Sequence, residues 1–366
     1  MKEMKKSLFI IVILSAAIWG AYYSSHQYSL SKDAASKSDS EESGNADIPT
    51  DPPKELADRP AKISLTFAGD VMLDRNVWHN YKDVGLKKLL SDFDTSLFKD
   101  VDLSVLNLEG PISKQPIDDD WQSGSMIFNF PPESVDFLKF AGIKAVSLAN
   151  NHTYNAGKNN FVYTQQVLKE NNIGNFGRQI GFNETEDIYR FDGEIPVSVI
   201  GLDVLAEYID GEIISAIKAE KANNRFVIMM PHWGVEYSQK HHSSQESVAK
   251  KWINAGADMI IGGHPHVIQD FEVIDGVPVF YSLGNFIFDQ YFSPETQESL
   301  VLSAEISEEE IVVKIIPVFQ TKSAPKVADG AKKESILEML MTAESIGEAQ
   351  KKGDDTIIID RETTID

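Results

Sequence analysis

The sequence predicts an α/β protein whose chemistry lies at the ends of its strands. Short apolar runs alternate with helical patterns along most of the 366 residues, which is typical of an α/β fold. One apolar run ends in Gly262-Gly263 and then places His264 and His266 one residue apart. Ligands of open α/β sheets bind beyond the carboxyl ends of strands, so several such ends are predicted to share one pocket.

The periodicity places the elements in order from about Lys62. Helices are expected at 134–141, 158–171, 211–223 and 244–255. A strand is expected over 277–285, and residues 300–319 predict a hairpin that is broken at 307–310. Two stacked sheets are therefore expected. After Lys332 the sequence predicts one amphipathic helix and little else.

Composition limits the class of protein. A hydrophobic content of 42% with 10% aromatic residues supports a large core. The chain has no cysteine, which excludes disulfides, a thiolate metal site and lipoprotein acylation. The formal net charge is −22, which argues against nucleic acid as a partner. A polyanionic partner would need a cation or a local basic groove.

The first residues predict where the chain resides. Residues 1–6 are basic, and 7–23 form an uncharged apolar run, slightly short of the roughly 20 residues that span a bilayer. Ser15-Ala16-Ala17 would suit a cleaved signal peptide, but the aromatic residues that follow favour an uncleaved transmembrane signal anchor. The positive-inside rule then predicts a single-pass cell-membrane protein with the bulk of the chain extracytoplasmic.

The rest of the chain divides by composition. Residues 24–60 are rich in Ser, Asp, Glu, Pro and Lys, and are expected to form a disordered linker. One globular domain is expected over 61–325, with 326–366 as a C-terminal extension.

Polar side chains follow several apolar runs and match the donors that divalent transition metals prefer, imidazole nitrogen and carboxylate oxygen. Each of them alone is more typical of a capped turn, but together they predict a metal centre. The predicted ligands are Asp70, Glu109, His232, His264 and His266.

Other polar residues at strand ends have two readings each. Asn151 offers an amide oxygen beside His152, which is either a general acid that stays off the metal or a structural histidine in a turn. Trp233 and Glu236 follow His232 and would line a substrate cleft or pack. Asn285 would contact substrate or orient a ligand.

Six motifs in order carry a family resemblance. They are FAGDVML (67–73), NLEGP (107–111), ANNH (149–152), PHWGVEY (231–237), GGHPHV (262–267) and YSLGNF (281–286). Together they resemble the bacterial capsule-synthesis CapA family, whose poly-γ-glutamate members are also called PgsA. That family is similar to the calcineurin-like metallophosphoesterases, which implies a four-layer αββα sandwich with metals at the sheet ends.

The resemblance also implies roles for single residues. It places one divalent ion, such as Mn, Fe, Zn or Mg, on Asp70 and His266, a second on Asn151, His232 and His264, a bridge at Glu109, and a catalytic histidine at His152. Two positions depart from the phosphoesterase pattern. Met72 replaces an imidazole, and Thr153 replaces the acidic residue that orients the catalytic histidine. One occupied site, or a strong and a weak one, is therefore expected.

The resemblance implies a membrane-anchored component of capsule or poly-γ-glutamate biosynthesis or export. Its partners would be the anionic polymer and the membrane synthase or ligase subunits. The centre would belong either to a metal-dependent hydrolase or transferase or to a non-catalytic polymer-binding module. The alternatives are a secreted phosphoesterase acting on nucleotides or cell-wall phosphates, and a structural partner of the synthase.

Overall fold

The computed structural model describes residues 60–114, 126–347 and 349–361. The predicted anchor at 7–23 and nearly all of the predicted linker lie outside these ranges. Within the ranges that are described, no helix is both long enough and apolar enough to cross a membrane.

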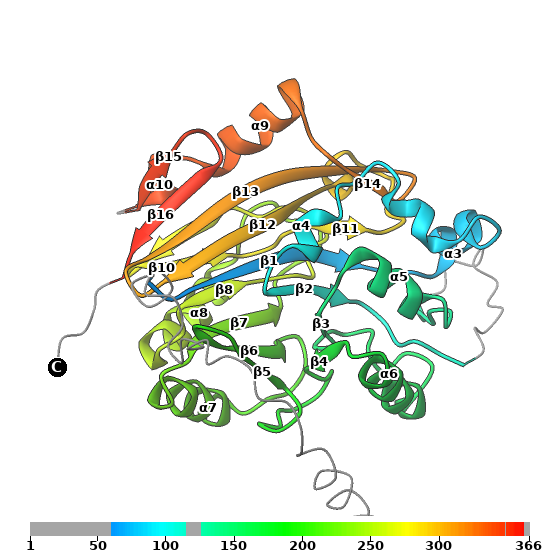
Figure 1. Ribbon diagram of the computed structural model, residues 1–366, viewed down its shortest axis with the longest axis horizontal. Helices are drawn as coiled ribbons and strands as arrows, with labels where there is room; N and C mark the ends of the chain where they lie inside the picture. The colour runs from blue at the N-terminus through cyan, green and yellow to red at the C-terminus, as the bar shows by residue number, and fades with distance from the viewer. Residues whose placement is uncertain (1–59, 115–125, 348, 362–366) are drawn as a thin grey trace, which may run out of the picture. The chain divides into compact units, whose positions relative to one another are not determined.

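The first sheet has ten strands and is mixed (Figure 1). Its central strand, β1, runs parallel to β2 and β11 and antiparallel to β12. The order across the sheet is β15-β16-β13-β12-β1-β2-β3-β4, with β11 on β1 and β14 on β13. The strands are β1 (Lys62–Val71), β2 (Leu103–Leu108), β3 (Ala145–Ser147), β4 (Gly174–Phe176), β11 (Asn285–Ile287), β12 (Glu298–Ser307), β13 (Glu310–Thr321), β14 (Ala324–Val327), β15 (Gln350–Lys352) and β16 (Thr356–Asp360).

The second sheet has six strands in the order β5-β6-β7-β8-β10-β9. Its inner strands β6, β7, β8 and β10 run parallel, and antiparallel strands close both edges. The strands are β5 (Ile188–Asp192), β6 (Pro196–Asp203), β7 (Phe226–His232), β8 (Met259–Ile261), β9 (Phe271–Ile274) and β10 (Val277–Phe280).

The sheets pack face to face, and helices cover their outer faces. One apolar core joins inward side chains of both sheets, such as Phe67 and Ile228. A second core lies between the first sheet and α3 (Arg75–Tyr81), η1 (Leu86–Leu90), α4 (Ser96–Lys99), α5 (Ser134–Ala141) and α6 (Lys158–Glu170). A third lies between the second sheet and α7 (Asp210–Ala222) and α8 (Ser243–Ala255). The α/β prediction is confirmed, and the layers fit the implied αββα arrangement.

The C-terminal elements complete the inner face of the wider sheet. Apolar side chains of α9 (Gly330–Leu340) and α10 (Ala343–Ile346) join the core between the sheets. The sequence predicted one helix after Lys332, whereas β15 and β16 also add to the first sheet. All of β15 is exposed, so it carries no apolar pattern from which it could have been predicted.

The predicted helices agree with α5, α6, α7 and α8 to within one residue at each end. The predicted hairpin is the antiparallel pair β12 and β13. The strand predicted over 277–285 is in fact two strands in different sheets, β10 and β11. The chain passes from one sheet to the other through a turn at Gly284, which has a φ of 72°. This crossing brings Asn285 alongside β1.

Candidate metal centre

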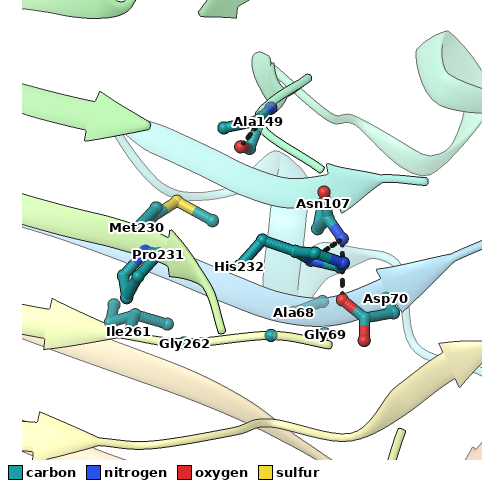
Figure 2. Close-up of a pocket in the computed structure, with 12 residues that line it drawn as sticks. Ala68, Gly69, Asp70, Asn107, Ala149, Met230, Pro231, His232, Ile261 and Gly262 are labelled. Atoms are coloured by element: carbon teal, nitrogen blue, oxygen red, sulfur yellow. Dashed lines mark hydrogen bonds between the residues drawn. The ribbon is translucent and has the colours of Figure 1, made fainter. Parts of the chain in front are cut away.

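Strand register brings polar side chains of both sheets to one place. Asp70 in β1 stands opposite Asn107 in β2 and opposite Asn285 in β11. His232 ends β7 and forms an isolated bridge with Gly263. Figure 2 shows Asp70 and His232 reaching toward Asn107 from the two sheets. The predicted convergence of strand ends is therefore present in the fold.

Two glycines permit this close approach. A Cβ at Gly69 would lie 1.9 Å from Gly284 O, which accepts a hydrogen bond from Asp70 N at 3.0 Å. A Cβ at Gly263 would lie 2.6 Å from Asp70 Oδ1. Any larger residue at either position would push apart the strand ends that carry the polar groups.

Asp70, Glu109 and His266 form what we call the first half-site. All three are buried, and their ligand atoms lie within 4.8 Å of one another. His266 Nδ1 is 3.6 Å from Asp70 Oδ2, and His266 Nε2 is 3.6 Å from Glu109 Oε1. Asn107 Nδ2 donates to Asp70 Oδ1 at 2.8 Å, which fixes that carboxylate.

Asn285 sets the tautomer of His266. The Asn285 amide nitrogen donates to Gln290 Oε1 and to Thr296 O, both at 3.0 Å, so its oxygen faces His266 Nδ1 at 2.9 Å. Nδ1 must therefore carry the hydrogen, and Nε2 of the neutral ring carries the lone pair. That lone pair faces a carboxylate oxygen, Glu109 Oε1, an arrangement that a cation between them would stabilise.

Asn151, His232 and His264 form the second half-site. His232 Nε2 lies 3.0 Å from Asn151 Oδ1, and the rings of His232 and His264 are 4.8 Å apart between centroids. Glu236, which follows β7, brings a carboxylate within 4.8 Å of the ligand atoms of His264 and His266. The structure thus joins Glu236 to this group.

The electrostatics of the centre suit a cation. Burial raises the pKa of Asp70 to about 6, and burial together with the Asp70 charge raises the pKa of Glu109 well above its usual value. Burial lowers the pKa of His264 to about 4 and of His266 to about 3, and lowers that of His232 well below normal. The imidazoles are therefore neutral at pH 7, as metal ligands must be.

Two buried atoms at the centre have no hydrogen-bond partner among the described residues, Glu109 Oε1 and His264 Nδ1. Such groups are rare in folded proteins and call for a ligand. A small cavity of about 10 Å³ is lined in part by Asp70, Asn107 and His232 (Figure 2). The donor set of neutral imidazoles, carboxylates and an amide oxygen fits a divalent ion such as Mn, Fe or Zn.

His152 lies at the edge of the first half-site. Its Nε2 is 3.9 Å from Glu109 Oε1, and its ring stacks on Phe128 at 4.0 Å between centroids. Its Nδ1 is 2.9 Å from Asn155 Oδ1, which also accepts from Phe128 N at 2.7 Å. Asn155 therefore orients the ring. In the phosphoesterase pattern this role belongs to an acidic residue at the position of Thr153.

Thr153 instead serves the turn. Its hydroxyl donates to Leu148 O and lies 3.0 Å from Asn150 Oδ1. Burial lowers the pKa of His152, so that this imidazole is neutral at pH 7.

Two of the predicted substrate contacts have other positions. Trp233 is 1% exposed, stacks on Trp252 at 5.5 Å, and donates from Nε1 to Tyr281 O at 2.8 Å. The structure thus places it in the core between the second sheet and α8 rather than at the site. Asn285 is also fully buried and orients His266, which is the second of its two predicted roles.

Sequence reasoning missed Asn107 and Asn155. Asn107 contacts Asp70 and His232 and accepts from Asn150 Nδ2 at 3.0 Å. A signal for Asn107 was present in the sequence. The strand LSVLNL is apolar except for Asn107 and one serine near its start. Asn155 lies in a polar turn where nothing distinguishes it from its neighbours.

Fold and site together define a two-sheet α/β protein with a buried, metal-capable centre at its strand ends. The family model described as "Bacterial capsule synthesis protein PGA_cap" matches residues 64–290, and the chain belongs to this family. The resemblance predicted from the six motifs is therefore confirmed.

Relatives extend the match beyond those residues. The capsule biosynthesis protein CapA of Bacillus anthracis is 28% identical over 319 residues, 81% of this chain and 77% of the relative. The PGA biosynthesis protein CapA of Bacillus subtilis (strain 168) is 26% identical over 299 residues, 76% of this chain and 77% of the relative. The crystal structure of TT1561 of Thermus thermophilus superposes with a TM-score of 0.36 at 12% identity, covering 67% of this chain and 98% of that one; this similarity is too low to support a conclusion.

Proposed function

We propose that this protein takes part in capsule or poly-γ-glutamate synthesis or export, and that its centre binds divalent metal. Family membership and the names of the two Bacillus relatives support the process. One observation carries the metal: the lone pair of His266 Nε2 faces Glu109 Oε1 at 3.6 Å inside the protein. At this distance the two atoms do not hydrogen-bond to each other, and each is of a type that ligates divalent metal.

Each half-site has its own part in this proposal. Asp70, Glu109 and His266 would hold one ion, and Asn151, His232 and His264 would hold another, with Glu236 beside them. A divalent ion bound there supplies positive charge that attracts and polarises anionic oxygen. This local positive charge would offset the repulsion between an anionic polymer and a protein with a net charge of −22.

His152 separates the catalytic version of the proposal from the binding version. Because Nδ1 donates to Asn155, any proton that His152 exchanges with a substrate passes through Nε2. In a hydrolase or transferase, Nε2 would first take up a proton and then transfer it to the leaving oxygen. In a non-catalytic module the neutral ring would only accept a hydrogen bond at Nε2 from an N–H of the polymer.

The proposal also includes the place of the protein in the cell. Residues 7–23 would anchor it in the cell membrane, and the domain would lie on the extracytoplasmic side, beside the membrane subunits of a synthase. Protease treatment of intact cells tests this arrangement. Cleavage of the domain outside the cell agrees with it, whereas full protection until the cells are lysed contradicts it.

Metal content is the direct test of the centre. We expect elemental analysis of the full-length chain to find divalent metal in stoichiometric amount, and the His264→Ala/His266→Ala variant to lose it. Metal-free wild type should then bind poly-γ-glutamate less tightly than the loaded protein. Wild type that takes up no divalent ion while folded, or polymer binding that is unchanged after chelation, would contradict the proposal.

A second candidate function is a secreted phosphoesterase. The observation that favours it is the oriented imidazole of His152 next to Glu109. Steady turnover of a generic phosphoester that is lost in His152→Ala would support this activity. Absence of turnover with several divalent ions would exclude it in favour of the binding module.

A further inference from the structure

Arg75 is a cation fixed beside the centre, and the predicted site did not include it. It begins α3 with a φ of 49°, a conformation that is unfavourable for a residue with a Cβ. Its Nε donates to Asp289 Oδ2 at 3.1 Å, and Nη2 donates to the other oxygen of the same carboxylate. Tertiary contacts therefore decide where the guanidinium lies.

Asp289 holds this guanidinium in one orientation. Its side chain is 2% exposed, and it also accepts from Asn76 N and Asn76 Nδ2, both at 3.2 Å. A bidentate pair uses two of the five donor hydrogens of arginine and fixes the plane of the group.

Among the residues that the structure describes, the opposite edge of the guanidinium has only a weak acceptor. Nη1 lies 3.7 Å from Met126 Sδ, and a thioether sulfur accepts hydrogen bonds poorly. Met126 is itself 54% exposed, and the next residue, Ile127, is 50% exposed. The Nη1 edge therefore contacts the exposed apolar side chain of Met126.

Aromatic rings connect Arg75 to the centre. The guanidinium carbon lies 5.0 Å from the centroid of Phe128, the ring that stacks on His152. It lies 5.9 Å from the centroid of Phe288, whose ring is 4.7 Å from that of His266. One extended ligand can therefore reach both Arg75 and the centre.

We propose that the Nη1 edge of Arg75 is a subsite for a carboxylate of the bound polymer, next to the metal centre. A single guanidinium edge suits a monoanion, whereas a phosphate dianion would lie beside Asp289 with one cation to balance it. The apolar side chains of Met126 and Ile127 suit the methylene groups that separate the carboxylates of poly-γ-glutamate. This inference rests on the proposed function.

The test is equilibrium binding of the full-length, metal-loaded chain. The ligands are an oligomer of γ-linked glutamate, the same oligomer with its side carboxylates amidated, and inorganic phosphate. The variants are Arg75→Lys and the neutral pair Arg75→Gln/Asp289→Asn, which leaves no buried carboxylate unpaired. Lys250→Gln on α8 is the control, because it removes one positive charge from an exposed helix position. Metal content is measured for every variant.

We expect both Arg75 variants to bind the carboxylate oligomer about tenfold or more weakly. Their metal content and their affinity for the amidated oligomer should match wild type, and Lys250→Gln should bind normally. Unchanged affinity for the carboxylate oligomer would overturn the subsite alone. Arg75 variants that no longer bind inorganic phosphate but still bind the carboxylate oligomer would also overturn the carboxylate assignment. Wild type that binds no oligomer would overturn the proposed function as well.

Discussion

The two half-sites differ in how the chain holds them. The first half-site is built on strand register, since Asp70 lies within β1 between β2 and β11, and two asparagines bond its members. In the second half-site only His232 lies in a strand, and Asn151 and His264 lie beyond strand ends. Asn151 lies in a turn, and His264 has a φ of 97° and an unpartnered Nδ1 among the described residues.

This difference indicates which half-site is preorganised for a ligand. Side chains held by packing and outer hydrogen bonds lose little freedom when an ion binds, so their affinity is higher. We therefore expect the first half-site to bind metal more tightly than the second. The expectation of one strong and one weak site is kept, but the order differs from the sequence argument, because Met72 removes an imidazole from the first site and would make that site the weaker one.

The largest effect should come from His266. Its ligand atoms lie close both to Asp70 and Glu109 and to Glu236 and His264, so His266→Ala should weaken both half-sites. We expect metal affinity to fall by more than about 100-fold, beyond the effect of losing an outer partner. Titration of the metal-free protein measures this loss. His242→Asn, which keeps a side-chain cap on α8, is the control, and retention of one tightly bound ion in His266→Ala would contradict the prediction.

The next effect concerns pH in the metal-free protein. Burial raises the pKa of folded Asp70 to about 6 from 3.8, so the folded state holds a proton that the unfolded state releases. Asp70 therefore makes its full contribution to the free energy of unfolding below pH 3.8, and this contribution is lost as the pH rises through 6. The free energy of unfolding of Asp70→Asn, relative to that of wild type, should thus be about 3 kcal/mol higher at pH 7 than at pH 3.8.

Denaturant unfolding in chelator at several pH values checks this difference between Asp70→Asn and wild type. With metal restored, the order should reverse, because the variant lacks a carboxylate ligand. If the stability difference between Asp70→Asn and wild type does not vary with pH, Asp70 does not ionise in this range.

Asn285 should have an intermediate effect, limited to the first half-site. Asn285→Ala removes the acceptor that fixes the His266 tautomer but leaves every proposed ligand in place. Metal affinity of the tighter site should fall about 10- to 100-fold, while the weaker site changes little. Two-site metal titration distinguishes the sites. Equal weakening of both would mean that the half-sites are not independently held.

The smallest effect should come from Trp233, which lies behind the second half-site in the core. Trp233→Phe loses the hydrogen bond to Tyr281 O and should cost about 2 kcal/mol of unfolding free energy. Metal and polymer binding should be unchanged in the folded variant. A polymer affinity that falls several-fold at constant metal content would return Trp233 to the substrate site.

The sequence predicted those features that depend on local pattern. The four helices α5 to α8 follow from apolar periodicity, and ligand positions such as Asp70 and His232 follow from polar residues that end apolar runs. The passage from β10 to β11 could not be read in the same way. Its apolar run is interrupted only by Ser282, Gly284 and Asn285, which are typical of a turn that ends a strand, so the pattern does not reveal that the chain changes sheets there.

Partners that meet only in the folded protein were also hidden. Arg75 and Asp289 are separated by 214 positions, and neither stands in a pattern that points to the other. Asn155 is three positions from His152, yet a turn of polar residues offers several equivalent acceptors. Geometry, rather than residue type, selects one of them.

The distance in sequence between neighbours at the centre has a consequence for biosynthesis. The amide of His264 donates to a carboxylate 194 positions earlier, and β11 must then be laid beside β1. Closing such long loops is slow, and it requires the ribosome to have released most of the chain. Nascent protein that stops before residue 285 therefore lacks the β11 strand beside Asp70 and the Asn285 partner of His266, and we expect the proposed centre to be completed late in folding.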